Sequence, residues 1–161
     1  MTLVELGVAG LVSALVIGVM VMWASTVIRT ETHLGSDDDA AQSLRIAREN
    51  LGKDIRRAEA VFTAEDDVLE IWIDLDRDGT QTSGERIIWT IDEDGTLGRA
   101  AGDGAVRIDA EGLDTAASGF AYDGSTPSQV RNVSFTLVLP IEGVADAEDR
   151  AVTASIHIRN A

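Results

Sequence analysis

The chain has 161 residues, enough for one domain and an N-terminal extension, and it carries a formal net charge of −15. This balance argues against a nucleic-acid-binding surface, because such affinity depends on clustered Lys and Arg that release counterions from phosphates. The chain contains no cysteine, which excludes disulfide bonds and thiolate metal sites. Most of the negative charge lies after Glu59, which predicts an acidic domain exposed to water and divalent cations.

An uncharged segment fills the N-terminal part of the sequence. Leu6 to Ile28 is a run of 23 residues without a formal charge, and a membrane-spanning helix needs about 20. A secretory signal peptide fits poorly, because positive residues precede its apolar region and here Glu5 does. Trp23 and Arg29 near the end of the run are typical of a membrane interface. Residues 1–30 are therefore predicted to form a transmembrane helix.

Glu5 is the exception within this segment. A carboxylate at the edge of an apolar span is costly unless it is paired, and it is a candidate functional residue for that reason. The nearest permanent cation in the sequence is the α-amine of Met1, which can pair with Glu5 of its own chain or of a neighbouring copy.

The segment Met1-Thr2-Leu3-Val4-Glu5-Leu6, followed by the apolar run, resembles the mature N-terminus of type IV pilins and of the pseudopilins of type II secretion. The resemblance implies that a prepilin peptidase removes a basic leader just before Met1 and that Met1 is N-methylated. Met1 stands where Phe is usual in this family, and it is also compatible with a translational start. The resemblance further implies assembly into a filament, with Met1 and Glu5 as the assembly residues.

The helix is predicted to continue to about residue 62. Ser36 with Asp39 resembles a capping box next to Gly35, so the helix is expected to bend or restart there. A helix over 1–62 would be about 90 Å long, so its first half must protrude from a small domain. Apolar residues at helical spacing should face a sheet, and they are Leu44, Ala47, Leu51, Ile55, Ala58 and Phe62.

The same helical segment is locally basic, with five basic residues against Glu49 and Asp54: Arg45, Arg48, Lys53, Arg56 and Arg57. A basic helix on an acidic chain can attract other copies of the chain, and the alternative interpretation is a solvated helix face.

Alternation of apolar and polar residues predicts strands after Phe62. These strands are expected at 68–74, 86–92 and 96–99, with Asp94-Gly95 as a hairpin turn, then near 106–108 and 120–122, and finally at 133–139 and 152–158 around an acidic loop at 141–149. The segments 88–91, 95–99 and 156–160 are similar to J-type minor pseudopilins and related minor pilins. The C-terminal disulfide and the proline near position 22 of many major pilins are missing.

Residues 74–85 match the ligand pattern of an EF-hand loop, although strands flank it here. Alternate acidic side chains on a tight loop converge on one point, Gly79 permits the turn, and a terminal glutamate binds calcium through both oxygens. Four carboxylates within this loop repel one another unless a cation is present, which favours a calcium site over a solvated loop. The predicted ligands are Asp74, Asp76, Asp78, Thr80, Thr82 and Glu85.

We therefore expect an α+β fold: a transmembrane helix (1–30), its amphipathic second half (31–62) and an acidic β-rich domain with a small antiparallel sheet (63–161). The expected function is a non-enzymatic subunit of a type IV pilus-like filament, placed in the cytoplasmic membrane before assembly and in a surface filament or periplasmic pseudopilus afterwards. Its expected partners are copies of itself or other pilin-like subunits, the prepilin peptidase and the membrane. A minor pseudopilin of a type II secretion system and, from another class, a membrane-anchored calcium-binding module are the alternatives.

Overall fold

The computed structural model describes residues 17, 19, 20, 41–140 and 150–158. The chain divides into two units, Met1–Asp39 and Ala40–Ala161. In the first unit Ile17, Val19 and Met20 are helical and expose their side chains. No helix within the described residues is long and apolar enough to cross a membrane. Apart from these three residues, the predicted transmembrane helix lies outside the described residues, as do the assembly residues Met1 and Glu5 and the expected bend at Ser36.

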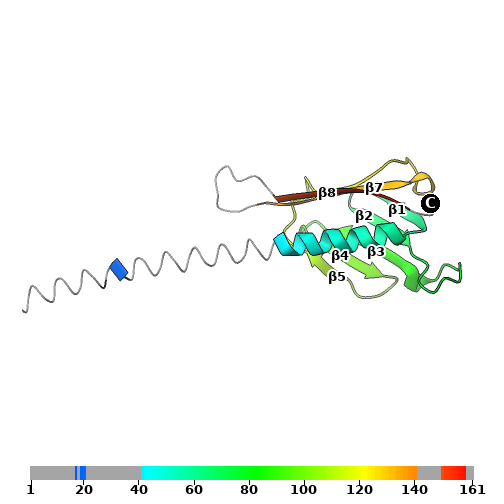
Figure 1. Ribbon diagram of the computed structural model, residues 1–161, viewed down its shortest axis with the longest axis horizontal. Coiled ribbons are helices and arrows are strands. Elements are labelled where there is room, and N and C mark those ends of the chain that lie inside the picture. The colour runs from blue at the N-terminus through cyan, green and yellow to red at the C-terminus, as the bar shows by residue number, and fades with distance from the viewer. Residues whose placement is uncertain (1–16, 18, 21–40, 141–149, 159–161) are drawn as a thin grey trace, which may run out of the picture. The chain divides into compact units, whose positions relative to one another are not determined.

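The second unit is α+β, as predicted, but its strands form two antiparallel sheets where the sequence analysis expected one (Figure 1). Residues 41–57 form the helix. The five-stranded sheet has the order β1 (Ala60–Ala64), β2 (Val68–Trp72), β3 (Arg86–Ile91), β4 (Leu97–Ala101) and β5 (Arg107–Ala110). The three-stranded sheet consists of β6 (Gly119–Tyr122), β7 (Asn132–Leu139) and β8 (Arg150–His157). Short 3-10 helices, η1 (Ser83–Glu85) and η2 (Pro127–Gln129), lie in the connections.

The hairpin between β3 and β4 turns at the Asp94-Gly95 pair that the sequence analysis identified. Gly95 has a φ of 76°, which L side chains rarely adopt, and its N–H donates to the carbonyl of Asp92 at 3.0 Å. A side chain at this position would also collide with the backbone carbonyl of Leu113. Glycine is therefore required both for the turn and for the close passage of a second segment.

The helix ends at Arg57, earlier than predicted, and Phe62 lies in β1. The N–H of Glu59 donates to the carbonyl of Trp72 at 2.9 Å, so the backbone passes directly from the helix into pairing with β2. Val61 and Thr63 are β-branched and suit the sheet. Strand pairing outweighs the helical spacing that placed Phe62 on the apolar stripe.

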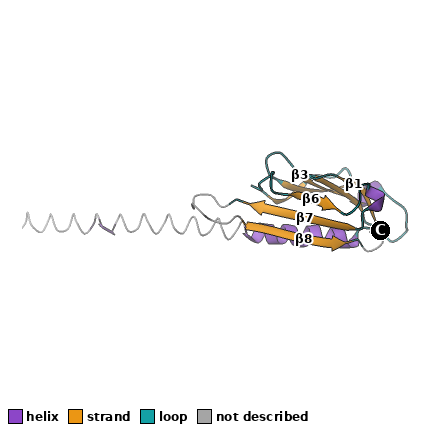
Figure 2. Cartoon of the chain, turned by 90° about the horizontal axis from the view of Figure 1, so that it is seen from above, coloured by secondary structure: helices purple, strands orange, loops and turns teal. Residues whose placement is uncertain are grey.

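The helix packs against both sheets, and one hydrophobic core includes residues of all three elements. On the side of the five-stranded sheet, Asp54 accepts hydrogen bonds from Trp89 Nε1 at 3.2 Å and Arg99 Nε at 2.7 Å. On the other side Gly52 brings the helix close to β8, because a Cβ there would lie 3.1 Å from Ile156 Cδ1. Figure 2 shows β6, β7 and β8 side by side in the smaller sheet.

Candidate metal centre

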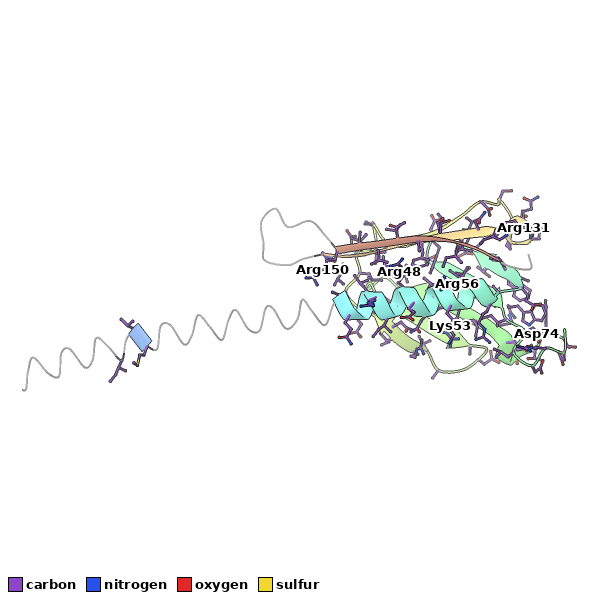
Figure 3. All side chains as sticks on the ribbon, in the orientation of Figure 1. Arg48, Lys53, Arg56, Asp74, Arg131 and Arg150 are labelled. Atoms are coloured by element: carbon purple, nitrogen blue, oxygen red, sulfur yellow. The ribbon has the colours of Figure 1, made fainter. Side chains whose placement is uncertain are left out.

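The acidic loop with the EF-hand pattern connects β2 to η1 and β3. It begins at Asp74, two residues after β2, and ends at Glu85, which immediately precedes β3. Figure 3 shows that Asp74, the first residue of the loop, lies at one end of the domain. The antiparallel pairing of β2 with β3 therefore holds both ends of the loop at one edge of the domain.

Three carboxylates converge within this loop. One oxygen from each of Asp74, Asp76 and Asp78 lies within 4.8 Å of the others. Asp76 and Asp78 are exposed, and Asp74 is half-buried. Hard oxygen donors in this arrangement suit calcium, which accepts six to eight of them.

Backbone N–H groups hold the three side chains in place. Asp74 accepts from Arg77 N at 2.6 Å and from Gly79 N at 3.1 Å, and Asp78 accepts from Thr80 N at 2.6 Å. Asp76 accepts from Asp78 N at 3.2 Å. Gly79 adopts a φ of 71°, consistent with its predicted place at the turn.

The pKa of Asp76 reflects its surroundings in the loop. The N–H of Asp78 lowers the pKa of Asp76, but desolvation and the charges of Asp78, Glu85 and Asp74 outweigh it and raise the pKa above the ordinary value. The folded loop therefore resists the third negative charge, and a cation bound between the carboxylates would remove this penalty.

Glu85 faces a different set of partners. It is 4 % exposed, and its carboxylate accepts hydrogen bonds from Leu75 N at 2.8 Å, Thr82 N at 3.2 Å, Thr82 Oγ1 at 3.1 Å and Trp72 Nε1 at 3.3 Å. Led by the bond from Leu75, these donors lower the pKa of Glu85 to about 2, against the opposing effect of burial. Glu85 thus links the two ends of the loop.

Of the six predicted ligands, the structure brings together the carboxylates of Asp74, Asp76 and Asp78. Thr80 donates its backbone N–H to Asp78, and the Thr82 hydroxyl is bonded to Glu85. Glu85 would have to exchange its present hydrogen bonds for a metal ion to act as a bidentate ligand. The contribution of Trp72 was not anticipated, because its indole reaches Glu85 across the loop and no local spacing indicates this.

Comparison of the chain with protein-family models, curated proteins and solved structures finds no match.

Proposed function

We propose that this protein is a structural subunit of a type IV pilus-like filament. The observation that carries the proposal is the acidic Glu5 directly before an apolar run of 23 residues, in the segment Met1-Thr2-Leu3-Val4-Glu5-Leu6. The domain is consistent with such a subunit, because the helix at residues 41–57 packs its apolar stripe into the domain core. The N-terminal segments would pack in the filament core and the acidic domains would face outward.

In this proposal Glu5 pairs with the N-terminal amine of a neighbouring subunit. An unpaired carboxylate costs about 2.5–3.5 kcal/mol in the apolar part of a membrane, by insertion scales. An α-amine has a reference pKa of about 7.7–8.0 and is largely protonated near neutral pH. The pair would offset this cost and set the axial register of each added subunit. It requires a basic amine at Met1, either unmodified or N-methylated, which mass spectrometry of the chain from filaments can test.

Glu5→Ala tests the proposal directly. The variant should be expressed and inserted in the membrane, yet the fraction recovered in sheared filaments should fall at least about tenfold, because 1.4 kcal/mol corresponds to a factor of ten. Glu5→Asp, with a carboxylate one methylene shorter, should be intermediate. Glu111→Ala, which removes an exposed carboxylate of the domain, is the matched control and should assemble normally. Normal filament yield from Glu5→Ala would refute the pairing.

A minor pseudopilin of a type II secretion system is the second candidate. Of the segments similar to J-type pseudopilins, 88–91 and 95–99 lie on the β3–β4 hairpin, and Ile156 and His157 are the last residues of β8. Copy number decides between the two: a subunit that forms most of a purified filament is a pilin, and one found at a few copies per periplasmic assembly is a minor pseudopilin.

We further propose that the loop at 74–85 binds one calcium ion, held by Asp74, Asp76 and Asp78. The converging carboxylates and the raised pKa of Asp76 support this proposal. Millimolar calcium outside the cell would fill even a weak site. A membrane-anchored calcium-binding module shares this loop but offers no role for Glu5, which is why it ranks below the filament subunit.

The calcium proposal predicts that Asp76→Asn stabilises the calcium-free domain but abolishes its stabilisation by calcium. The folded state raises the pKa of Asp76, so a neutral side chain at this position should stabilise the calcium-free domain at pH 7. The same substitution should remove the rise in melting temperature that calcium gives to the parent protein, since a ligand stabilises only the state that binds it. Asp94→Asn, which is also exposed but lies in the turn at the opposite end of β3 from the loop, should keep the calcium response. Identical melting curves of the parent protein in EDTA and in millimolar calcium would exclude the site.

A further inference from the structure

A groove of about 380 Å³ runs between the helix and β8. Arg45, Arg48 and Arg56 line it from the helix, with Glu49 among them, and Ser155 belongs to the opposite wall. Figure 3 shows Arg48 and Arg56 on the side of the helix that faces β8, whereas Lys53 lies on the other side. β8 is the last strand of its sheet, so the groove also follows an open sheet edge.

The three groove arginines are exposed, and none forms an ion pair with a carboxylate of the described residues. Arg86, Arg99 and Arg107 pair with Glu70, Asp54 and Asp109, whereas Lys53, Arg57, Arg77 and Arg131, like the groove arginines, form no ion pair among the described residues. The whole chain has 28 acidic residues for 13 basic ones. Three unpaired arginines that line one groove therefore concentrate positive charge on a strongly acidic chain and leave it available to another molecule.

The domain also carries a complementary acidic surface. Two neighbouring turns, between β1 and β2 and between β3 and β4, each present three consecutive exposed carboxylates. The N–H of Ile91 donates to the carbonyl of Asp67 at 2.9 Å, so the two turns lie at the same end of the sheet. We call this surface the acidic end, and it consists of Glu65, Asp66, Asp67, Asp92, Glu93 and Asp94.

The distance between the groove arginines is similar to the distance between the two acidic turns. Arg48 and Arg56 are eight residues apart on the helix, which corresponds to about 12 Å at ~1.5 Å per residue. The two acidic turns are separated by two strand spacings, about 10 Å. One turn can therefore face Arg45 and Arg48 while the other faces Arg56.

We infer that the groove binds the acidic end of a second copy of this chain. The contact is heterologous, because the groove of one copy meets a different surface of the next, and repeated contacts of this kind produce an open chain of subunits. The inference deepens the proposed filament function and rests on it only for the requirement that copies lie side by side.

The overall negative charge of each copy opposes this contact at long range. The Debye length is about 8 Å at 0.15 M ionic strength, so charges farther apart are largely screened. The closest pairs, which in this contact have opposite sign, then dominate. A free polyanion would be repelled by the negative charge of the domain in the same way, but it would lack the two acidic turns that match the spacing of the arginines.

Disulfide trapping in the full-length chain tests the contact, because the protein has no cysteine of its own. Glu49→Cys in one copy and Glu93→Cys in another, co-expressed and oxidised in membranes, should yield a cross-linked dimer. Lys53→Cys with Glu93→Cys is the matched control, since Lys53 is exposed but does not line the groove, and it should yield little dimer. Equal dimer from both pairs, or none from either, would overturn the inference.

Charge reversal provides the second measurement. Arg48→Glu with Arg56→Glu should reduce the trapped dimer about tenfold, because each exposed pair contributes a few-fold to association and reversal adds repulsion. Asp66→Arg with Glu93→Arg in the partner copy, trapped through Asp94→Cys, should restore the dimer. Lys53→Glu with Arg57→Glu changes the net charge equally and should leave it unchanged. Failure of rescue together with unaffected filaments would reject the groove contact and leave the filament proposal standing. Trapped dimer in the absence of filaments would support the groove contact and reject the filament proposal.

Discussion

The link between Asp54, Trp89 and Arg99 allows a precise test of how the helix is held on the five-stranded sheet. Asp54 is 6 % exposed and Trp89 is fully buried, and both donors bond to the same oxygen, Asp54 Oδ2. Asp54→Ala leaves the buried indole N–H without an acceptor, which costs about 1–3 kcal/mol. The bond from Arg99, whose side chain is 24 % exposed, adds about 1 kcal/mol after allowance for solvent. The better helix propensity of alanine returns about 0.5 kcal/mol.

The free energy of unfolding should therefore fall by about 1.5–3.5 kcal/mol. Urea denaturation of a soluble version comprising residues 40–161, which form one compact unit, measures this change. Lys53→Ala is the control, because Lys53 is the exposed neighbour of Asp54, and its effect should stay within about 0.5 kcal/mol. In a Trp89→Phe background Asp54→Ala should cost less, since no indole N–H remains to be left unpaired. A loss below about 1 kcal/mol in the parent background would show that water replaces Asp54 and that this link does not hold the helix.

Two further predictions concern the loops. The donors that lower the pKa of Glu85 to about 2 stabilise the fold above the ordinary pKa of a glutamate, so stability should fall as the pH drops from about 4.5 to 2, and Glu85→Gln should flatten this part of the pH profile in thermal melts. Gly95→Ala should cost about 2 kcal/mol or more in urea, because it combines a positive φ with a collision at Leu113, whereas Gly84→Ala, where a Cβ meets open space, should change little.

Much of the domain could be predicted from local patterns. The alternation of apolar residues located β2, β3 and β7, and the Asp94-Gly95 pair located the hairpin between β3 and β4. The helix was correct over residues 41–57, and its stripe of Leu44, Ala47, Leu51 and Ile55 is buried. These features depend on periodicity and on one turn residue, and both are visible within short windows of sequence.

Features that depend on distant partners could not be predicted. The start of β1 was assigned to the helix, because Phe62 continues the helical spacing and only the pairing with β2 reveals the strand. The division into two sheets was missed for the same reason, since no local pattern states which strands pair across long connections. The spacing of acidic residues identified the triad at 74–78, but it did not show that hydrogen bonds from Leu75, Thr82 and Trp72 hold the carboxylate of Glu85.

Salt and chelators separate the two roles that charge has in these proposals. Salt near 1 M shortens the Debye length to about 3 Å and should weaken contacts between the groove arginines and the acidic end, while an apolar filament core is not weakened by screening. EDTA removes calcium from the loop at 74–85 without screening surface charges. Filaments that loosen in salt but not in EDTA would therefore be held by the groove contact, and filaments that loosen only in EDTA would depend on the order of the loop. Because Glu85 fastens the loop to Trp72 without a metal ion, we expect the first outcome: calcium adjusts the stability of each domain, and complementary charge positions one domain against the next.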